Sequence, residues 1–210
     1  EIVEKEASLC RLNIRQSEIS RKSANVAVRI LGTEFPEEIV TVTAHYDSVP
    51  EGPGAYDNMS GGAIVMEAFH YFAEHRPART MEFIWFGSEE KGLVGSRNYV
   101  KSHEAEMRNH VFNLNVDLAG QLLGGNVLGV TADPSVCTEL KALMEENRLG
   151  VTIKNQVWAS DSNTFAWKGV PALTLNRDGF GMHTRHDTVE YISPRGLEEG
   201  AKTLCTAAAW

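Results

Sequence analysis

Histidines and carboxylates that could hold metal ions occur in four separate stretches of this sequence. The side chains concerned are His45, Asp47, Asp57, Glu89, Glu90, Asp117 and His183. Carboxylates and imidazoles without cysteine suit a catalytic zinc ion, or a similar divalent cation, better than a structural zinc site. One zinc ion needs about three protein ligands and an open position. Five ligand candidates that include an aspartate fit two metal ions better, roughly 3.5 to 4 Å apart and bridged by that carboxylate.

The elements that must position these side chains follow from the hydrophobic pattern. Apolar and β-branched runs predict strands at residues 25–32, 38–47, 80–87, 110–120, 125–131, 151–157 and 170–175. Helical patterns occur at residues 60–75, 88–107, 134–148, 161–168 and 194–208. This alternation predicts an α/β fold, a three-layer α/β/α sandwich around a mixed, mostly parallel sheet.

Most of the candidate side chains follow predicted strand ends. His45 and Asp47 close the second strand, Glu89 and Glu90 follow the third, and Asp117 ends the fourth. Open α/β sheets bind ligands beyond the carboxyl ends of their strands. We therefore expect these side chains to meet at one rim of the sheet.

Composition excludes several classes of partner. The chain has 210 residues, 42% of them hydrophobic, and a formal net charge of -8. We expect one domain over residues 1–210, in which residues 1–23 match no motif and are consistent with the stub of a larger chain. The negative charge argues against nucleic acid and against an anionic membrane surface, and no transmembrane helix or signal peptide is expected. The three cysteines do not determine whether the protein works in an oxidising or a reducing compartment.

Five short motifs together carry a specific resemblance. They are AHYDSV, GAYDNMSGG, GSEEKGLVGS, NVDLAG and MHTRHDT, in that order. In this order they resemble the co-catalytic zinc aminopeptidases of peptidase family M28, over roughly residues 24–208. The resemblance implies a zinc-dependent exopeptidase fold, two Zn²⁺ ions or other divalent metals, and a peptide substrate. It also implies an extracellular or periplasmic location, because many members are exported.

Carried over residue by residue, the resemblance assigns each candidate a role. Asp57 bridges both metals, Glu90 and His183 complete one site, and His45 and Asp117 complete the other. Glu89 is then the general base. Neighbouring side chains at a strand-to-helix turn diverge, so one glutamate can bind a metal while the other faces the reacting water.

Two further aspartates are expected to support the ligands. Asp47, two residues beyond His45 in an extended chain, is placed to accept the other ring N–H of His45. Asp187 could do the same for His183. His186 is the rival of His183, which is favoured because it stands before Thr in the last motif. The resemblance also implies a cis peptide bond after Asp57.

The substrate pocket is less well defined by the motifs. Trp158 and Phe180, in loops near the predicted rim, are candidates to line it, and the resemblance places Asp161 near the cleft. Family members often carry an oxyanion-binding tyrosine at one of two places, which here hold Met182, Val157 and Trp158. The group that supports the oxyanion besides zinc is therefore open.

The leading interpretation is an aminopeptidase, and three alternatives remain. A carboxypeptidase or dipeptidase of the same family would need a cation for the substrate carboxylate, which Arg177 or Arg185 could supply. A glutaminyl-cyclase-like acyltransferase would typically use one metal. A catalytically dead interaction domain would bind none. Metal content therefore separates the last two alternatives from the aminopeptidase, whereas N-acetylated and C-amidated peptides separate the carboxypeptidase from it.

Overall fold

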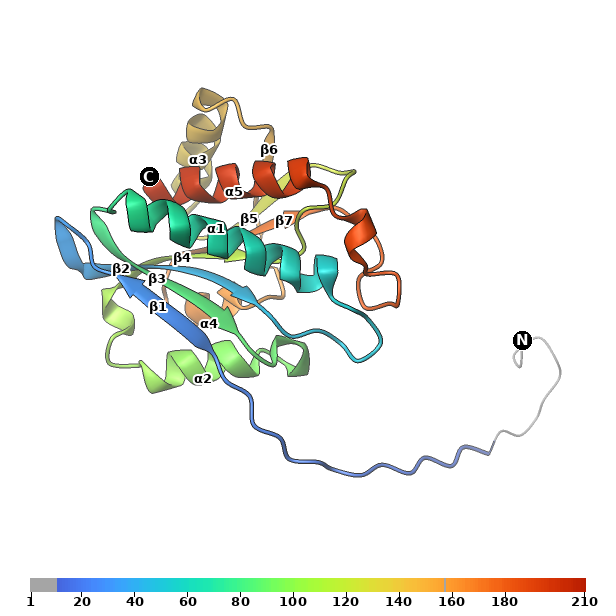
Figure 1. Ribbon diagram of the computed structural model, residues 1–210. Coiled ribbons are helices and arrows are strands. Elements are labelled where there is room, and N and C mark those ends of the chain that lie inside the picture. Colours follow the sequence, from blue (N-terminus) through green and yellow to red (C-terminus); the bar gives the residue numbers. More distant parts are fainter. Residues whose placement is uncertain (1–10, 157) are drawn as a thin grey trace.

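The computed structural model describes residues 11–156 and 158–210, and its centre is a seven-stranded mixed sheet (Figure 1). The strand order is β1-β3-β2-β4-β7-β5-β6. The strands are β1 (Val26–Ile30), β2 (Phe35–His45), β3 (Arg79–Phe86), β4 (His110–Val116), β5 (Asn126–Thr131), β6 (Val151–Asn155) and β7 (Ala172–Arg177). β3, β2, β4 and β7 are mutually parallel, whereas β1 and β5 pair antiparallel with β3 and β7. The four central strands therefore end at the same edge.

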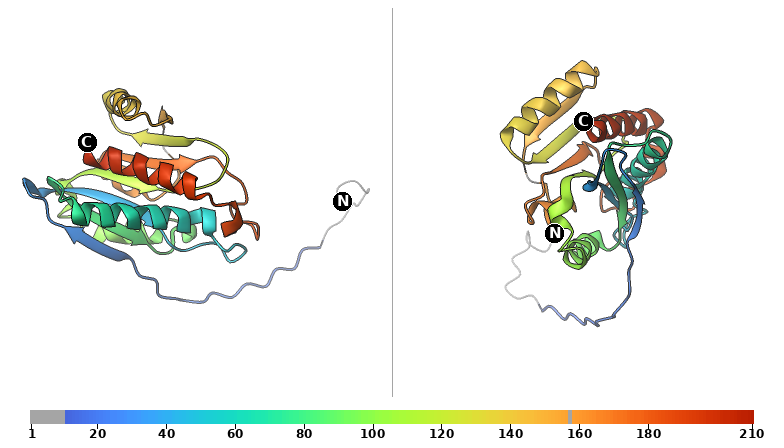
Figure 2. Two further views of the ribbon diagram at one scale, coloured as in Figure 1. Left: turned by 45° about the horizontal axis from the view of Figure 1, so that its top comes forward. Right: turned by 90° about the vertical axis from the view of Figure 1, so that its left-hand side faces the viewer.

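Helices cover both faces of the sheet, which confirms the expected three-layer α/β/α architecture. They are α1 (Ser60–Glu74), α2 (Val94–Ser102), α3 (Pro134–Glu146), α4 (Ser162–Ala166) and α5 (Pro194–Ala209). Figures 1 and 2 show α1, α3 and α5 on one face, and α2 and α4 on the other. Among the described residues, no helix has the length and apolarity needed to cross a membrane.

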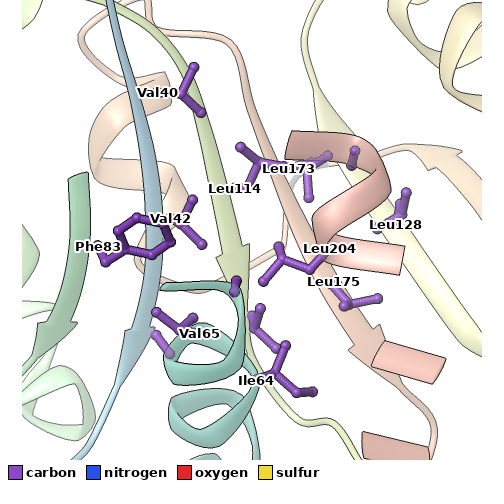
Figure 3. Close-up of a cluster of buried hydrophobic side chains, with 14 of the residues drawn as sticks. Val40, Val42, Ile64, Val65, Phe83, Leu114, Leu128, Leu173, Leu175 and Leu204 are labelled. Atoms are coloured by element: carbon purple, nitrogen blue, oxygen red, sulfur yellow. The ribbon is translucent and has the colours of Figure 1, made fainter. Parts of the chain in front are cut away.

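The main core lies between the sheet and the α1/α5 layer (Figure 3). Val40 and Val42 of β2 and Leu114 of β4 point into it, where they meet Val65 of α1 and Leu204 of α5. Successive side chains of a strand point to opposite faces, so the residues between these apolar positions face the α2/α4 layer. In β2 and β4 those alternating residues are polar, and they lead directly to the candidate site.

The segment after β3 differs from the expected continuous helix over residues 88–107. Glu89–Lys91 forms a single turn of 3₁₀ helix, and α2 begins only at Val94. Ser88 and Leu93 on either side of this turn have φ angles of 62° and 59°. Two left-handed residues interrupt helical geometry, so the pair Glu89–Glu90 sits on its own turn at the sheet edge.

Candidate metal centre and catalytic site

The structure brings the five predicted metal ligands together in two groups of three. His45, Asp57 and Asp117 form one group, and Asp57, Glu90 and His183 form the other. We call these the His45 site and the His183 site. In the His45 site, His45 Nε2 lies 3.1 Å from Asp57 Oδ1 and 3.4 Å from Asp117 Oδ1.

Asp57 belongs to both sites because its two oxygens face opposite ways. While Oδ1 faces His45, Oδ2 lies 3.0 Å from His183 Nε2, which is itself 3.1 Å from Glu90 Oε2. Asp57 is buried on the turn Ala55–Met59 between β2 and α1, and its peptide bond to Asn58 is cis, as the motif resemblance implied. This is the arrangement expected of a carboxylate that joins two metal ions.

The electrostatics of both sites favour a cation. Burial opposes a positive charge on His45, but hydrogen bonding with Asp117, Asp47 and Asp57 outweighs it and raises the pKa of His45. In the His183 site, Glu90 Oε1 is buried and has no hydrogen-bond partner among the described residues. Burial, with the charge of Asp57, also raises the pKa of Glu90. Buried carboxylates without enough donors fit divalent metal ions, which would neutralise them.

Glu89 lies beside the candidate metal ligands but belongs to neither group. Its Oε2 is 4.0 Å from His45 Nε2, at the edge of the His45 site. Burial raises the pKa of Glu89 to about 8, although the nearby charge of His45 opposes this rise. A half-buried carboxylate with this affinity for a proton suits a general base, and the geometry keeps it separate from its neighbour Glu90.

Asp47 connects the first motif to the glutamate turn. Its carboxylate accepts the backbone N–H of Glu89 at 2.9 Å and that of Glu90 at 3.3 Å. The same carboxylate lies 3.6 Å from His45 Nδ1, while the main-chain oxygen of Asp47 lies closer, at 3.1 Å. Burial would raise the pKa of Asp47, but His45 and the N–H of Glu89 lower it overall. Asp47 therefore supports the turn as well as His45.

Asp187 acts on a different partner from the one the sequence suggested. Its oxygens accept the backbone N–H groups of Tyr56, at 2.5 Å, and of Asp57, at 3.0 Å, rather than a ring N–H of His183. His183 points its Nε2 to Asp57 and Glu90, whereas His186 lies exposed outside both sites. Asp187 thus ties the His183 loop to the turn that carries the shared aspartate.

Comparison with known proteins identifies the family. The model of "Peptidase family M28" matches residues 25–208. The chain belongs to peptidase family M28. Its similar relatives include carboxypeptidase Q of Rattus norvegicus, 29% identical over 89% of this chain and 41% of that protein. The vacuolar membrane protease of Saccharomyces cerevisiae is 34% identical over 84% of this chain and 19% of its own length.

A solved structure supports both the family and the fold. The zinc aminopeptidase BSAP from Bacillus subtilis superposes with a TM-score of 0.78 and 28% identity, over 88% of this chain and 48% of that one. The M28 chain described here therefore spans less than half the length of these three relatives.

The predicted pocket residues lie in three different environments. Phe180 is 53% exposed and packs edge-on against Tyr191, with the ring centroids 4.6 Å apart. Gln121 holds its backbone, since Gln121 Nε2 donates to the Phe180 carbonyl oxygen and Gln121 Oε1 accepts the Phe180 N–H. Trp158 is half-buried against Gly129 of β5. Asp161 is fully buried near Ser96, and burial raises its pKa to about 7. Phe180 is thus the one of the three with a largely open face.

Met182 and Val157 are the other two positions where an oxyanion-binding tyrosine was sought, and neither is a tyrosine in this chain. Met182 is partly exposed in the His183 loop, and Val157 lies outside the described residues. The tyrosine nearest to the shared aspartate in sequence is Tyr56, whose hydroxyl donates to the main-chain oxygen of Arg177 at 2.5 Å. Burial raises the pKa of Tyr56 above its ordinary value. Its hydroxyl is therefore committed to holding the turn against the end of β7.

The buried residues that are hydrogen-bonded to Asp117, directly or through one neighbour, were not identified from the sequence. Ser160 donates to Asp117 Oδ2 at 2.6 Å, and Asn115 donates to Ser160 at 2.7 Å. A signal for Asn115 was present, because NLNVD alternates polar and apolar residues in a strand expected to be covered on both faces. Polar residues at such positions need buried partners. The identity of those partners depends on the fold.

Proposed function

We propose that this chain is the catalytic domain of a two-metal exopeptidase that removes the N-terminal residue of a peptide. The observation that carries the proposal is the shared aspartate, since Asp57 presents one oxygen to His45 at 3.1 Å and the other to His183 at 3.0 Å. A site for one zinc ion does not need such a carboxylate. The acidic surroundings also suit a substrate with a free ammonium group.

The chain's residues divide the work of hydrolysis between them. His45 and Asp117 would hold one metal ion, Glu90 and His183 the other, and Asp57 both. Bound divalent ions would polarise the scissile carbonyl and lower the pKa of a water molecule. Glu89 accepts the proton of the attacking water and passes it to the leaving amine. Asp47 keeps Glu89 and Glu90 in their separate orientations through their backbone N–H groups.

The test compares wild-type protein with Glu89→Gln. Zinc content is measured by atomic emission, and turnover is measured with an aminoacyl p-nitroanilide. We expect about two zinc ions per chain in both proteins, with kcat of the variant reduced by about 10²- to 10⁴-fold because only the base is lost. Full activity of Glu89→Gln would contradict its assignment as the base. Two bound zinc ions without turnover of any aminoacyl anilide would contradict the aminopeptidase.

A carboxypeptidase or dipeptidase is the second candidate, because carboxypeptidase Q is among the relatives. Arg177 supports it poorly, since its guanidinium is buried and paired with Glu199 at 2.9 Å and with Asn126 at 3.2 Å. Arg185 is exposed on the His183 loop, where its Nε donates to His186 Nε2 at 3.5 Å and its terminal N–H groups could face a carboxylate. Comparing one peptide with its N-acetylated and C-amidated forms separates the candidates. Loss of cleavage on acetylation supports the aminopeptidase, whereas loss on amidation supports the carboxypeptidase.

A further inference from the structure

A continuous chain of buried hydrogen bonds runs beneath the His45 site, on the side of the sheet that faces α4. Its members are Asn113, Thr43, Asn115 and Ser160, which we call the polar relay, and it ends on Asp117. Asn113 Nδ2 lies 3.2 Å from Thr43 Oγ1, which lies 2.8 Å from Asn115 Oδ1. Asn115 Nδ2 lies 2.7 Å from Ser160 Oγ, and Ser160 Oγ lies 2.6 Å from Asp117 Oδ2.

The relay is isolated from water, so each of its groups depends on its neighbours. All four members are at most 2% exposed. They come from three elements: β2, β4 and the loop before α4. β2 and β4 are parallel neighbours in which Thr43 is paired with Asn115. A buried polar group that loses its partner costs about 1 to 3 kcal/mol, so the members hold each other in one arrangement.

The carboxylate of Asp117, at the end of the relay, determines which group donates in every hydrogen bond of the relay. An ionised carboxylate only accepts, so the single proton of Ser160 must point to Asp117. Ser160 must then accept from Asn115, which turns the amide oxygen of Asn115 toward Thr43. Thr43 in turn donates to that oxygen and accepts from Asn113. The amide of Asn113 also donates to Thr41 at 3.0 Å, so its two protons are both used.

The relay has a consequence for how Asp117 can bind a metal ion. Its Oδ2 is occupied by Ser160, which leaves Oδ1, the oxygen 3.4 Å from His45 Nε2, to face the site. We propose that the polar relay is a positioning device that holds Asp117 as a one-oxygen ligand and so sets the metal affinity of the His45 site. This inference rests on the proposed two-metal function.

The test uses three conservative variants in the whole chain. Ser160→Ala removes the donor to Asp117, and Thr43→Val removes a hydroxyl three hydrogen bonds away from Asp117 without changing side-chain shape. Thr174→Val is the matched control, because Thr174 is a buried threonine paired with Asn115 in the sheet, yet its hydroxyl bonds Ser162 at 2.7 Å instead of the relay. Circular dichroism and thermal melting establish that each variant is folded.

The readouts are zinc affinity, by competition with a chromophoric chelator, and the visible spectrum of Co²⁺-substituted protein. We expect Ser160→Ala to weaken the binding of one of the two zinc ions 10- to 100-fold and to change the Co²⁺ spectrum. Thr43→Val should act in the same direction with a smaller effect, and Thr174→Val should match wild type in both readouts.

The outcomes separate this inference from the proposed function. Unchanged zinc affinity in Ser160→Ala, with two zinc ions bound to wild type, would overturn the relay alone. An equal loss of affinity in Thr174→Val would also overturn it, because general loosening of the sheet would then explain the effect. Wild-type protein that binds no zinc would instead overturn the two-metal function, and the relay would fall with it.

Discussion

Asp47→Asn tests whether the glutamate turn is held by a charge from the neighbouring strand end. Asp47 accepts the N–H groups of Glu89 and Glu90, and hydrogen bonds to charged groups contribute about 1.5 to 3 kcal/mol each. Asparagine keeps one acceptor oxygen, and the main-chain oxygen of residue 47 still faces His45 Nδ1 at 3.1 Å. We therefore expect the loss to be centred on the turn. It should amount to about 1.4 to 2.7 kcal/mol of transition-state stabilisation, or 10- to 100-fold in kcat/KM.

The assay measures kcat/KM on an aminoacyl p-nitroanilide together with zinc content. Asp133→Asn is the matched control, because Asp133 also accepts a backbone N–H, that of Ser135 at 2.9 Å, but does so at the exposed start of α3. Its kcat/KM should equal that of wild type, and its stability should change little because asparagine also caps helices well. Asp47→Asn with kcat/KM within twofold of wild type and full zinc content would refute the reasoning.

Three further predictions concern packing, pH and metal removal. A Cβ atom at Gly129 would lie 2.1 Å from Trp158 Cδ1, so Gly129→Ala should displace the indole, change tryptophan fluorescence and destabilise the fold by about 1 to 3 kcal/mol. Burial lowers the pKa of His110 below its ordinary 6.5, so the unfolded chain binds its proton more readily. Stability should therefore fall as pH drops below about 6.5, measured by urea unfolding, and His110→Gln should reduce that slope. Chelation should lower the melting temperature, and zinc at about 100 times its Kd should restore about 2.7 kcal/mol; an unchanged melting temperature would argue against metal binding in the folded state.

The common location of three candidate metal ligands could be predicted because His45, Glu90 and Asp117 each lie at or just after the end of a strand whose type is clear from its sequence. Parallel strands must end at a common edge, so His45, Glu90 and Asp117 could be placed together without knowledge of the strand order. The left-handed residues around Glu89–Lys91 were not visible, because Ser88 and Leu93 carry side chains that usually avoid positive φ. The expected continuous helix was therefore wrong at its start.

Hydrogen bonds between residues far apart in the sequence were the main feature of the site that could not be predicted. Asp187 was expected beside His183 because of its spacing of four residues, yet its hydrogen bonds reach Tyr56 and Asp57, about 130 positions away. The partner of Asp117, Ser160, comes from a loop whose path depends on the whole sheet. Spacing within a motif predicts local contacts, whereas these contacts follow from packing.

Side chains in β2 and β4 alternate between the two faces of the sheet. Even-numbered residues therefore stabilise the core, and odd-numbered residues form the candidate site. The even-numbered residues Val40, Val42 and Ala44, with Leu114 and Val116, belong to the hydrophobic core. The odd-numbered residues Thr43, Asn113 and Asn115 belong to the polar relay, and His45 and Asp117 are candidate metal ligands. A slip of one residue in either strand would exchange the two sets at once. A chain folded in the wrong register would then lose its core along with its catalytic site, so inactive chains of this kind would also be unstable.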